Sequence, residues 1–93
     1  MIGPMTLLQL VEDVDSLDDE LTVFWNPDES LASDSAVFVV DLDEEDEPEG
    51  LKEFIDVWHI RDVIKGKSSL AGLDAPNAEA KTALLLDYAE TGA

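Results

Sequence analysis

The sequence predicts an α+β domain in which a small antiparallel sheet of three strands packs with one N-terminal helix and two C-terminal helices, in the order α-β-β-β-α-α. Apolar residues repeat at helical spacing near both ends of the chain, whereas the middle holds short runs rich in β-branched and aromatic residues. The chain has 93 residues, of which 45% are hydrophobic, and this suffices for one modest core between two packed layers. We therefore expect a single domain covering residues 1–93.

The first helix is predicted at residues 7–14. Thr6 and Gln9 have the spacing of a capping box, in which each side chain bonds to the backbone of the other residue. Apolar residues then repeat at intervals of three and four, which indicates one buried helical stripe. These residues are Leu7, Leu10, Val11 and Val14. Residues 1–5 are expected to be disordered or to lie outside the natural chain, because Met5 is a second plausible start.

Two strands are predicted next, at residues 21–25 and 36–41. In the first, Leu21, Val23 and Trp25 are expected on one face and Thr22 and Phe24 on the other, and the turn residues Asn26-Pro27-Asp28 end the strand. The second is apolar on both faces. We expect it to lie in the centre of the sheet or to be covered on both sides.

The segment after Gly50 allows two interpretations. We predict a strand at residues 52–58 and a helix at residues 59–66 that ends at Gly66. The apolar residues from 51 to 58 also fit helical spacing, so a single helix at residues 51–65 is the alternative. A last helix is predicted to follow Asn77 as its N-cap and to end before Gly92. Its expected core residues are Ala80, Leu84, Leu85 and Tyr88.

The most acidic stretch of the chain separates the second predicted strand from the third. It runs from Asp41 to Gly50, between two apolar runs that we interpret as the arms of a β-hairpin. The tip of this hairpin would then carry a concentrated negative charge.

Charge is segregated along the chain. The net charge is −18, from 23 Asp and Glu against 5 Lys and Arg, and residues 1–49 hold no Lys or Arg. Such a field repels nucleic acid and anionic membranes and speeds encounter with basic partners. The sequence therefore predicts a basic protein as partner, with no direct binding to nucleic acid and no membrane association. It leaves the oligomeric state open.

Composition excludes several further classes. Because the chain has no Cys, it has no disulfides and no Cys-based zinc site. No run approaches the ~20 apolar residues that span a bilayer, and the N-terminus lacks the basic flank and long apolar region of a signal peptide. We expect a cytoplasmic location.

Four stretches carry a resemblance to known proteins. They are Leu17–Phe24 (LDDELTVF), Asp34–Val40 (DSAVFVV), Glu49–Val57 (EGLKEFIDV) and Leu84–Glu90 (LLLDYAE). In this order they resemble a family of short, acidic, uncharacterised bacterial proteins. More loosely, the chain is similar to the small acidic immunity proteins that neutralise bacterial toxins. The resemblance implies the α+β order of elements and assigns no functional residue.

Catalysis is not expected, and no cofactor is predicted. The chain has one His and one Arg, so pairs of nucleophile and base are scarce. His59 could act as a base with Asp56 or Asp62 as its orienting group, but a lone His between apolar residues is more often structural. No catalytic residue is therefore assigned.

No metal site is predicted either. Residues 41–45 begin like a calcium-binding loop, with acids at alternate positions. The pattern fails at Asp46, which stands where such a loop needs Gly for its sharp turn.

Protein recognition is the function that the sequence favours. We expect a noncatalytic module that binds and inhibits a basic protein, in the manner of an immunity protein or antitoxin. The alternatives are a nucleic-acid mimic that inhibits a DNA-binding or defence protein, and a structural or housekeeping domain with a solubilising acidic surface. Trp25 and Trp58 would anchor a partner if exposed, but both are expected to be buried. The predicted contact residues are Asp15, Asp18, Asp19, Glu20, Asp41, Asp43, Glu44, Glu45, Asp46 and Glu47.

Overall fold

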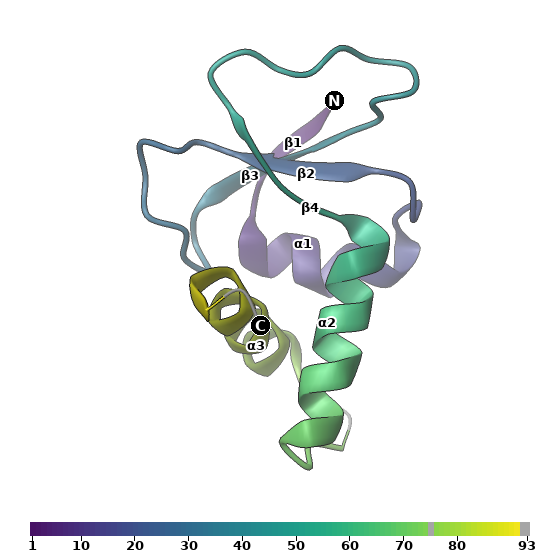
Figure 1. The fold of residues 1–93 in the computed structure, drawn as a ribbon, viewed down its shortest axis with the longest axis vertical. Coiled ribbons are helices and arrows are strands. Elements are labelled where there is room, and N and C mark those ends of the chain that lie inside the picture. The colour runs from purple at the N-terminus through teal and green to yellow at the C-terminus, as the bar shows by residue number, and fades with distance from the viewer. Residues whose placement is uncertain (75, 92–93) are drawn as a thin grey trace.

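A computed structural model describes residues 1–74 and 76–91, and it shows an antiparallel sheet with helices gathered on one side (Figure 1). The α+β class and the antiparallel sheet are confirmed. The predicted number of three strands is wrong, because the sheet has four strands in the order β1-β3-β2-β4. The elements are β1 (Ile2–Thr6), α1 (Leu7–Asp13), the 3₁₀ turn η1 (Val14–Ser16), β2 (Thr22–Trp25), β3 (Ala36–Val40), β4 (Lys52–Asp56), α2 (Val57–Leu70) and α3 (Ala78–Thr91).

The additional strand is β1, in the segment for which we expected disorder. It pairs antiparallel with β3, from Ile2 opposite Val39 to Thr6 opposite Ala36. Gly3 has a φ of 117°, and a Cβ atom at this position would lie 2.9 Å from the carbonyl oxygen of Val37. Only glycine allows the two backbones to approach so closely here. The position of β1 at the edge leaves β3 in the interior of the sheet, as its two apolar faces predict.

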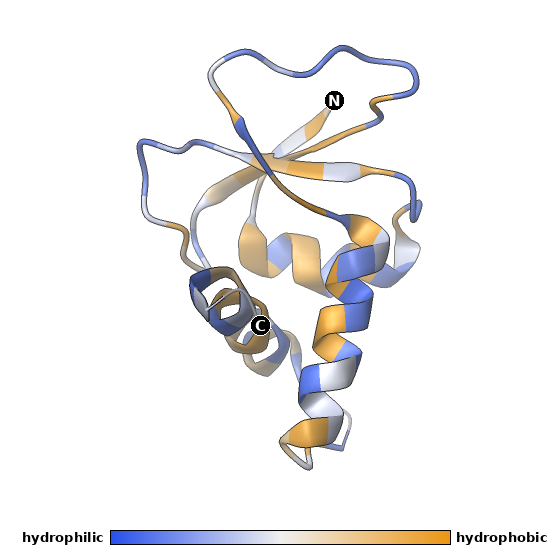
Figure 2. Ribbon diagram, in the orientation of Figure 1, coloured by the Kyte–Doolittle hydropathy of each residue, from blue (hydrophilic) through white to orange (hydrophobic). Residues whose placement is uncertain are grey.

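The predicted β-hairpin is wrong, because β3 and β4 do not pair. Both strands pair antiparallel with β2, which lies between them. Residues 41–51 therefore form a crossover that leaves β3 at one end of the sheet and enters β4 at the other. Figure 1 shows the crossover on the side of the sheet away from the helices, and Figure 2 shows that it is largely hydrophilic.

The two faces of the sheet are covered differently. On the helical face, strand residues join α1, α2 and α3 in one core cluster, which includes Val23, Val39 and Ile55. Phe24 and Val40 lie outside this cluster although each is at most 1% exposed. They belong to the opposite face, the one over which the crossover runs (Figure 1).

The first helix begins as its sequence predicts. The Thr6 hydroxyl accepts a hydrogen bond from the backbone NH of Gln9 at 3.1 Å, and the Gln9 side chain accepts one from the NH of Thr6 at 3.0 Å. The capping box is therefore confirmed. The α-helix ends at Asp13 and tightens into the 3₁₀ turn η1, as expected where acids crowd the negative end of the helix dipole.

The region from β4 to α2 differs from the prediction in its boundaries. The strand is Lys52–Asp56 and the helix is Val57–Leu70, so the alternative of one helix at 51–65 is wrong. A bulge in β4 pairs Val23 with Ile55 but the next residue, Phe24, with Glu53. As a result, Phe54 and Ile55 both pack against the helical core, which breaks the alternation of a regular strand.

The second helix runs through Gly66, so the predicted stop there is wrong. It ends at Leu70, and Gly72, which follows the C-cap residue Ala71, has a φ of 70°. The NH of Gly72 bonds to the carbonyl of Ser69, and the NH of Leu73 bonds to that of Ser68. This is a Schellman motif, the usual way in which a glycine ends a helix.

The last helix is close to its prediction. The Asn77 side chain accepts a hydrogen bond from the NH of Ala80 at 2.9 Å, as an N-cap does. The buried residues of α3 are Thr82 and Leu85, and Tyr88 packs against the core, whereas Leu84 is only half-buried. Gly92 lies outside the described residues. Within the described residues, no helix has both the length and the apolar character to cross a membrane.

Candidate functional site

Strand register brings two acidic segments to the same end of the sheet. Thr22, the first residue of β2, pairs with Val40 at the end of β3 and with Asp56 at the end of β4. The chain that enters β2 and the chain that leaves β3 therefore meet at one end. We call residues 18–20 and 41–45 together the acidic end of the sheet.

The first of these segments is fixed by its backbone. The carbonyls of Leu21 and Asp19 accept hydrogen bonds from the NH groups of Val57 and Trp58, at 2.9 and 3.3 Å. These NH groups open α2 and have no partner within the helix. Acids at residues 18–20 also lie near the positive end of the α2 dipole, where negative charge is favourable.

Arg61 secures the same segment from the side. Its guanidinium donates to the carbonyls of Val14 and Leu17, at 3.0 Å from Nε to Val14, and it forms ion pairs with Asp15 and Asp19. One cation thus bonds to carbonyls at both ends of η1 and offsets two of the surrounding acids. The acids of this region are held on a defined backbone.

The second segment is a turn organised by Asp41. The Asp41 carbonyl accepts from the NH groups of Glu44 and Glu45, at 3.1 and 2.7 Å, and its carboxylate accepts from the NH of Asp43 at 3.1 Å. Glu45 forms an ion pair with the N-terminal ammonium group of Met1. The hydrogen bond from this ammonium group is the main cause that lowers the pKa of Glu45 below its usual value.

Most of the carboxylates at the acidic end are not neutralised. Asp19 and Glu45 have cationic partners. Among the described residues, no cation pairs with the other five, which are Asp18, Glu20, Asp41, Asp43 and Glu44. Such a cluster creates a strong local negative potential.

The register thus brings seven of the ten predicted contact residues to one end. They are Asp18, Asp19, Glu20, Asp41, Asp43, Glu44 and Glu45. The other three lie elsewhere. Asp15 turns towards Arg61 on the helical side, and Asp46 and Glu47 lie further along the crossover.

Trp58 adjoins the acidic end and is 50% exposed, so its predicted burial is wrong. The helix begins at Val57, which is buried, and the next side chain is therefore turned outwards. Its ring stacks on His59, with 5.0 Å between the ring centroids, and its indole NH donates to Asp56 at 3.3 Å. Trp25, by contrast, packs against the core.

The surroundings of His59 give no catalytic pair within the described part of the chain. The ring nitrogen Nε2 lies 3.4 Å from the Tyr88 hydroxyl, and no carboxylate bonds to it. Asp56 is already engaged, because its two oxygens accept from the Thr22 hydroxyl and the Trp58 indole. Residues 1–74 and 76–91 also contain no group of three His, Asp or Glu side chains placed to hold a metal ion.

Comparisons of the chain with protein-family models, with curated proteins and with solved structures found no match. The two resemblances described above therefore stay predictions.

Sequence reasoning missed three residues of this site. The exposure of Trp58 depends on where α2 begins, and the roles of Arg61 and Asp56 depend on contacts with residues more than thirty positions away. One signal could have indicated Arg61, since it is the only Arg in a chain whose first 49 residues lack any base.

Proposed function

We propose that the protein binds and inhibits a basic protein through the acidic end of the sheet, with Trp58 as the apolar anchor. The observation that supports this most is the juxtaposition of a half-exposed indole with five carboxylates that form no ion pair within residues 1–74 and 76–91. Carboxylates steer a basic partner by long-range attraction, and an aromatic side chain supplies the short-range contact. No catalytic group is needed for this function.

The rigidity of the site favours a stoichiometric inhibitor. Residues 19–21 are fixed by the first turn of α2, and residues 41–45 by the turn around Asp41. A preordered surface loses less conformational entropy when a partner binds. A nucleic-acid mimic would instead need carboxylates in rows along an extended surface, whereas seven of the predicted residues gather at one end.

The product of the gene adjacent to the one that encodes this chain is the partner to test first. Calorimetric titration should give a defined stoichiometry and an affinity that falls at least about tenfold between roughly 0.05 M and 0.5 M NaCl. Poly-L-lysine serves as the reference for unspecific attraction. Equal affinity for both, or an affinity that salt does not change, would contradict the proposal.

The role of Trp58 is tested in the same titration. Trp58→Ala should weaken binding by ~30-fold, which corresponds to ~2 kcal/mol for a hot-spot aromatic. Trp58→Phe should retain most of the affinity because it keeps an aromatic face. The domain should stay folded in both variants, since half of this side chain is already in contact with water.

A further inference from the structure

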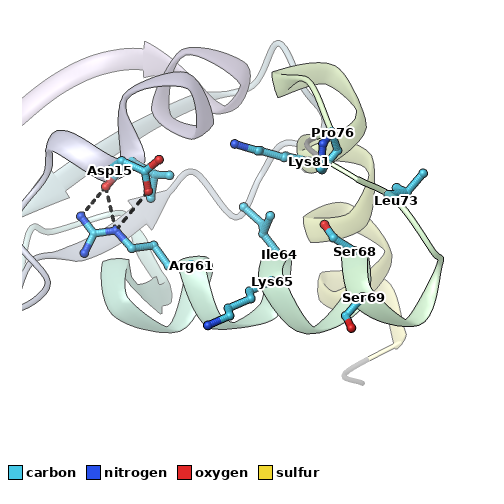
Figure 3. Close-up of a pocket in the computed structure, with 10 residues that line it drawn as sticks. Asp15, Arg61, Ile64, Lys65, Ser68, Ser69, Leu73, Pro76 and Lys81 are labelled. Atoms are coloured by element: carbon cyan, nitrogen blue, oxygen red, sulfur yellow. Dashed lines mark hydrogen bonds and ion pairs between the residues drawn. The ribbon is translucent and has the colours of Figure 1, made fainter.

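A pocket on the helical side of the molecule gathers bases in a chain that otherwise has few. It has a volume of about 540 Å³ and lies between η1, α2, α3 and the loop that joins the two helices (Figure 3). Three of the five Lys and Arg residues line it, namely Arg61, Lys65 and Lys81. Its volume falls in the range of ~300–1,000 Å³ that is typical of small-molecule sites.

Two of these cations are available to a ligand. Arg61 is already committed to Asp15, Asp19 and two carbonyls. Lys65 and Lys81 form no ion pair with a carboxylate of the described residues. Figure 3 shows the side chain of Lys81 extended across the pocket towards the side of Asp15, whereas Lys65 projects from the rim.

Ser68 provides an independent sign of a missing partner. It is 8% exposed, its hydroxyl is buried without a hydrogen-bond partner among the described residues, and it lines the pocket. In Figure 3 its side chain lies on the face of α2 that also carries Ile64, which is turned into the pocket. A buried hydroxyl without a partner is costly in a folded protein, and a ligand that accepts its proton would remove that cost.

The remaining walls decide the class of ligand. Ile64, Leu73 and Pro76 give the pocket apolar walls beside the Ser68 hydroxyl, and the ammonium group of Lys81 lies towards the Asp15 side. Asp15 at the Arg61 side disfavours a second negative charge on the ligand. These features suit a molecule with one anionic group and an apolar body.

We propose that the pocket binds a small organic carboxylate, whose head group contacts Lys81 and Ser68 and whose apolar body packs on Ile64, Leu73 and Pro76. This proposal does not depend on the function proposed for the acidic end. Preferential binding of an anion is unusual for this protein, because a molecule with a net charge of −18 would be expected to attract cations and repel anions.

Octanoate is a suitable probe, with octylammonium and octanol as ligands of the same chain length and different charge. In titrations of the full chain followed by amide NMR, octanoate should shift the signals of Ser68, Ser69 and Leu73. It should bind at least about tenfold more tightly than octylammonium or octanol. Octylammonium or octanol binding as tightly as octanoate would overturn the proposal.

Variants distinguish a specific octanoate site in the pocket from general attraction of an anion to Lys and Arg. Lys81→Met should weaken octanoate binding about tenfold, whereas Lys52→Met, which removes the same charge from β4, should leave it unchanged. Ser68→Ala should have effects of opposite sign, raising the unfolding midpoint of the free protein and weakening octanoate binding several-fold. Equal effects of Lys81→Met and Lys52→Met, or Ser68→Ala without an effect on octanoate affinity, would overturn the proposal.

Discussion

The acidic end of the sheet and the pocket beside α2 and α3 carry charges of opposite sign and are formed by different kinds of secondary structure. The acidic end consists of loop residues, most of whose carboxylates have no cationic partner in the described part of the chain. The pocket consists mainly of helix residues, with cations around an apolar hollow. The net charge of −18 thus hides two local environments with different preferences for ligands.

Arg61 stands at the boundary between these regions and links them. Arg61 lines the pocket, and its guanidinium bonds to the backbone and the carboxylates that lead towards the acidic end. Arg61 therefore contacts both regions.

The largest effect is expected from Arg61→Met. The side chain is about 28% exposed, and its loss leaves the carbonyls of Val14 and Leu17 without their charged donor. The free energy of unfolding, measured with urea, should fall by roughly 2–3 kcal/mol. Lys65→Met on the same helix is the control and should change it by less than ~0.5 kcal/mol, because Lys65 is exposed. Equal losses in the two variants would show that the contacts of Arg61 with the Val14 and Leu17 carbonyls do not stabilise the fold.

A smaller effect is expected when the crossover loses its charge. Replacing Asp43, Glu44, Glu45 and Asp46 with Ser should leave cooperative unfolding intact, because these side chains are exposed. Thermal unfolding should show a midpoint that is unchanged or slightly higher, since repulsion between like charges is reduced. Loss of the cooperative transition would mean that these acids are needed for the fold.

The smallest effect is expected in the loss of stability at low pH that depends on Glu45. Its pKa is lowered in the folded protein, mainly by the hydrogen bond from the Met1 ammonium group, so this contact stabilises the fold when the carboxylate is charged. The contribution is present above the unfolded pKa and is lost as the pH falls through the folded pKa. Compared with Glu45→Gln, the unmodified chain should therefore lose slightly more stability below about pH 4.5. Parallel stability curves for the two proteins would contradict this.

Local signals in the sequence predicted part of the fold well. The capping box at Thr6 and Gln9 and the N-cap at Asn77 are both formed, because each depends on residues three positions apart. The central place of β3 followed from its two apolar faces. These features depend only on short-range chemistry.

Features that depend on distant partners could not be predicted in this way. Gly3-Pro4 is a typical chain breaker, yet the fit of Gly3 against Val37 lets β1 join the sheet. The bulge turns Phe54 and Ile55 to the same face, so the apolar residues of this strand are spaced in the sequence as they would be in a helix. The sequence also could not show that β2 separates β3 from β4, which converts an expected hairpin tip into a crossover.

The candidate site likewise combines features that depend on the local sequence with features that depend on distant partners. Its acids could be named from composition, because charge is concentrated in two segments. The two segments meet at one end because Thr22 pairs with Val40. Trp58 is exposed beside them because α2 begins at Val57. Neither is a local property of the sequence.

Whether the acidic end itself contacts a basic protein is tested most directly by comparing two triple variants with the same net charge. One carries Glu20→Gln, Asp43→Asn and Glu44→Gln at the acidic end, and the other carries Asp28→Asn, Glu29→Gln and Asp34→Asn in the β2–β3 loop at the opposite end of the sheet. If the acidic end contacts the basic protein, the first variant should bind it at least about tenfold more weakly, and the second should lose less than about threefold. Equal losses would show that only the overall charge attracts the partner, and this would contradict a dedicated site.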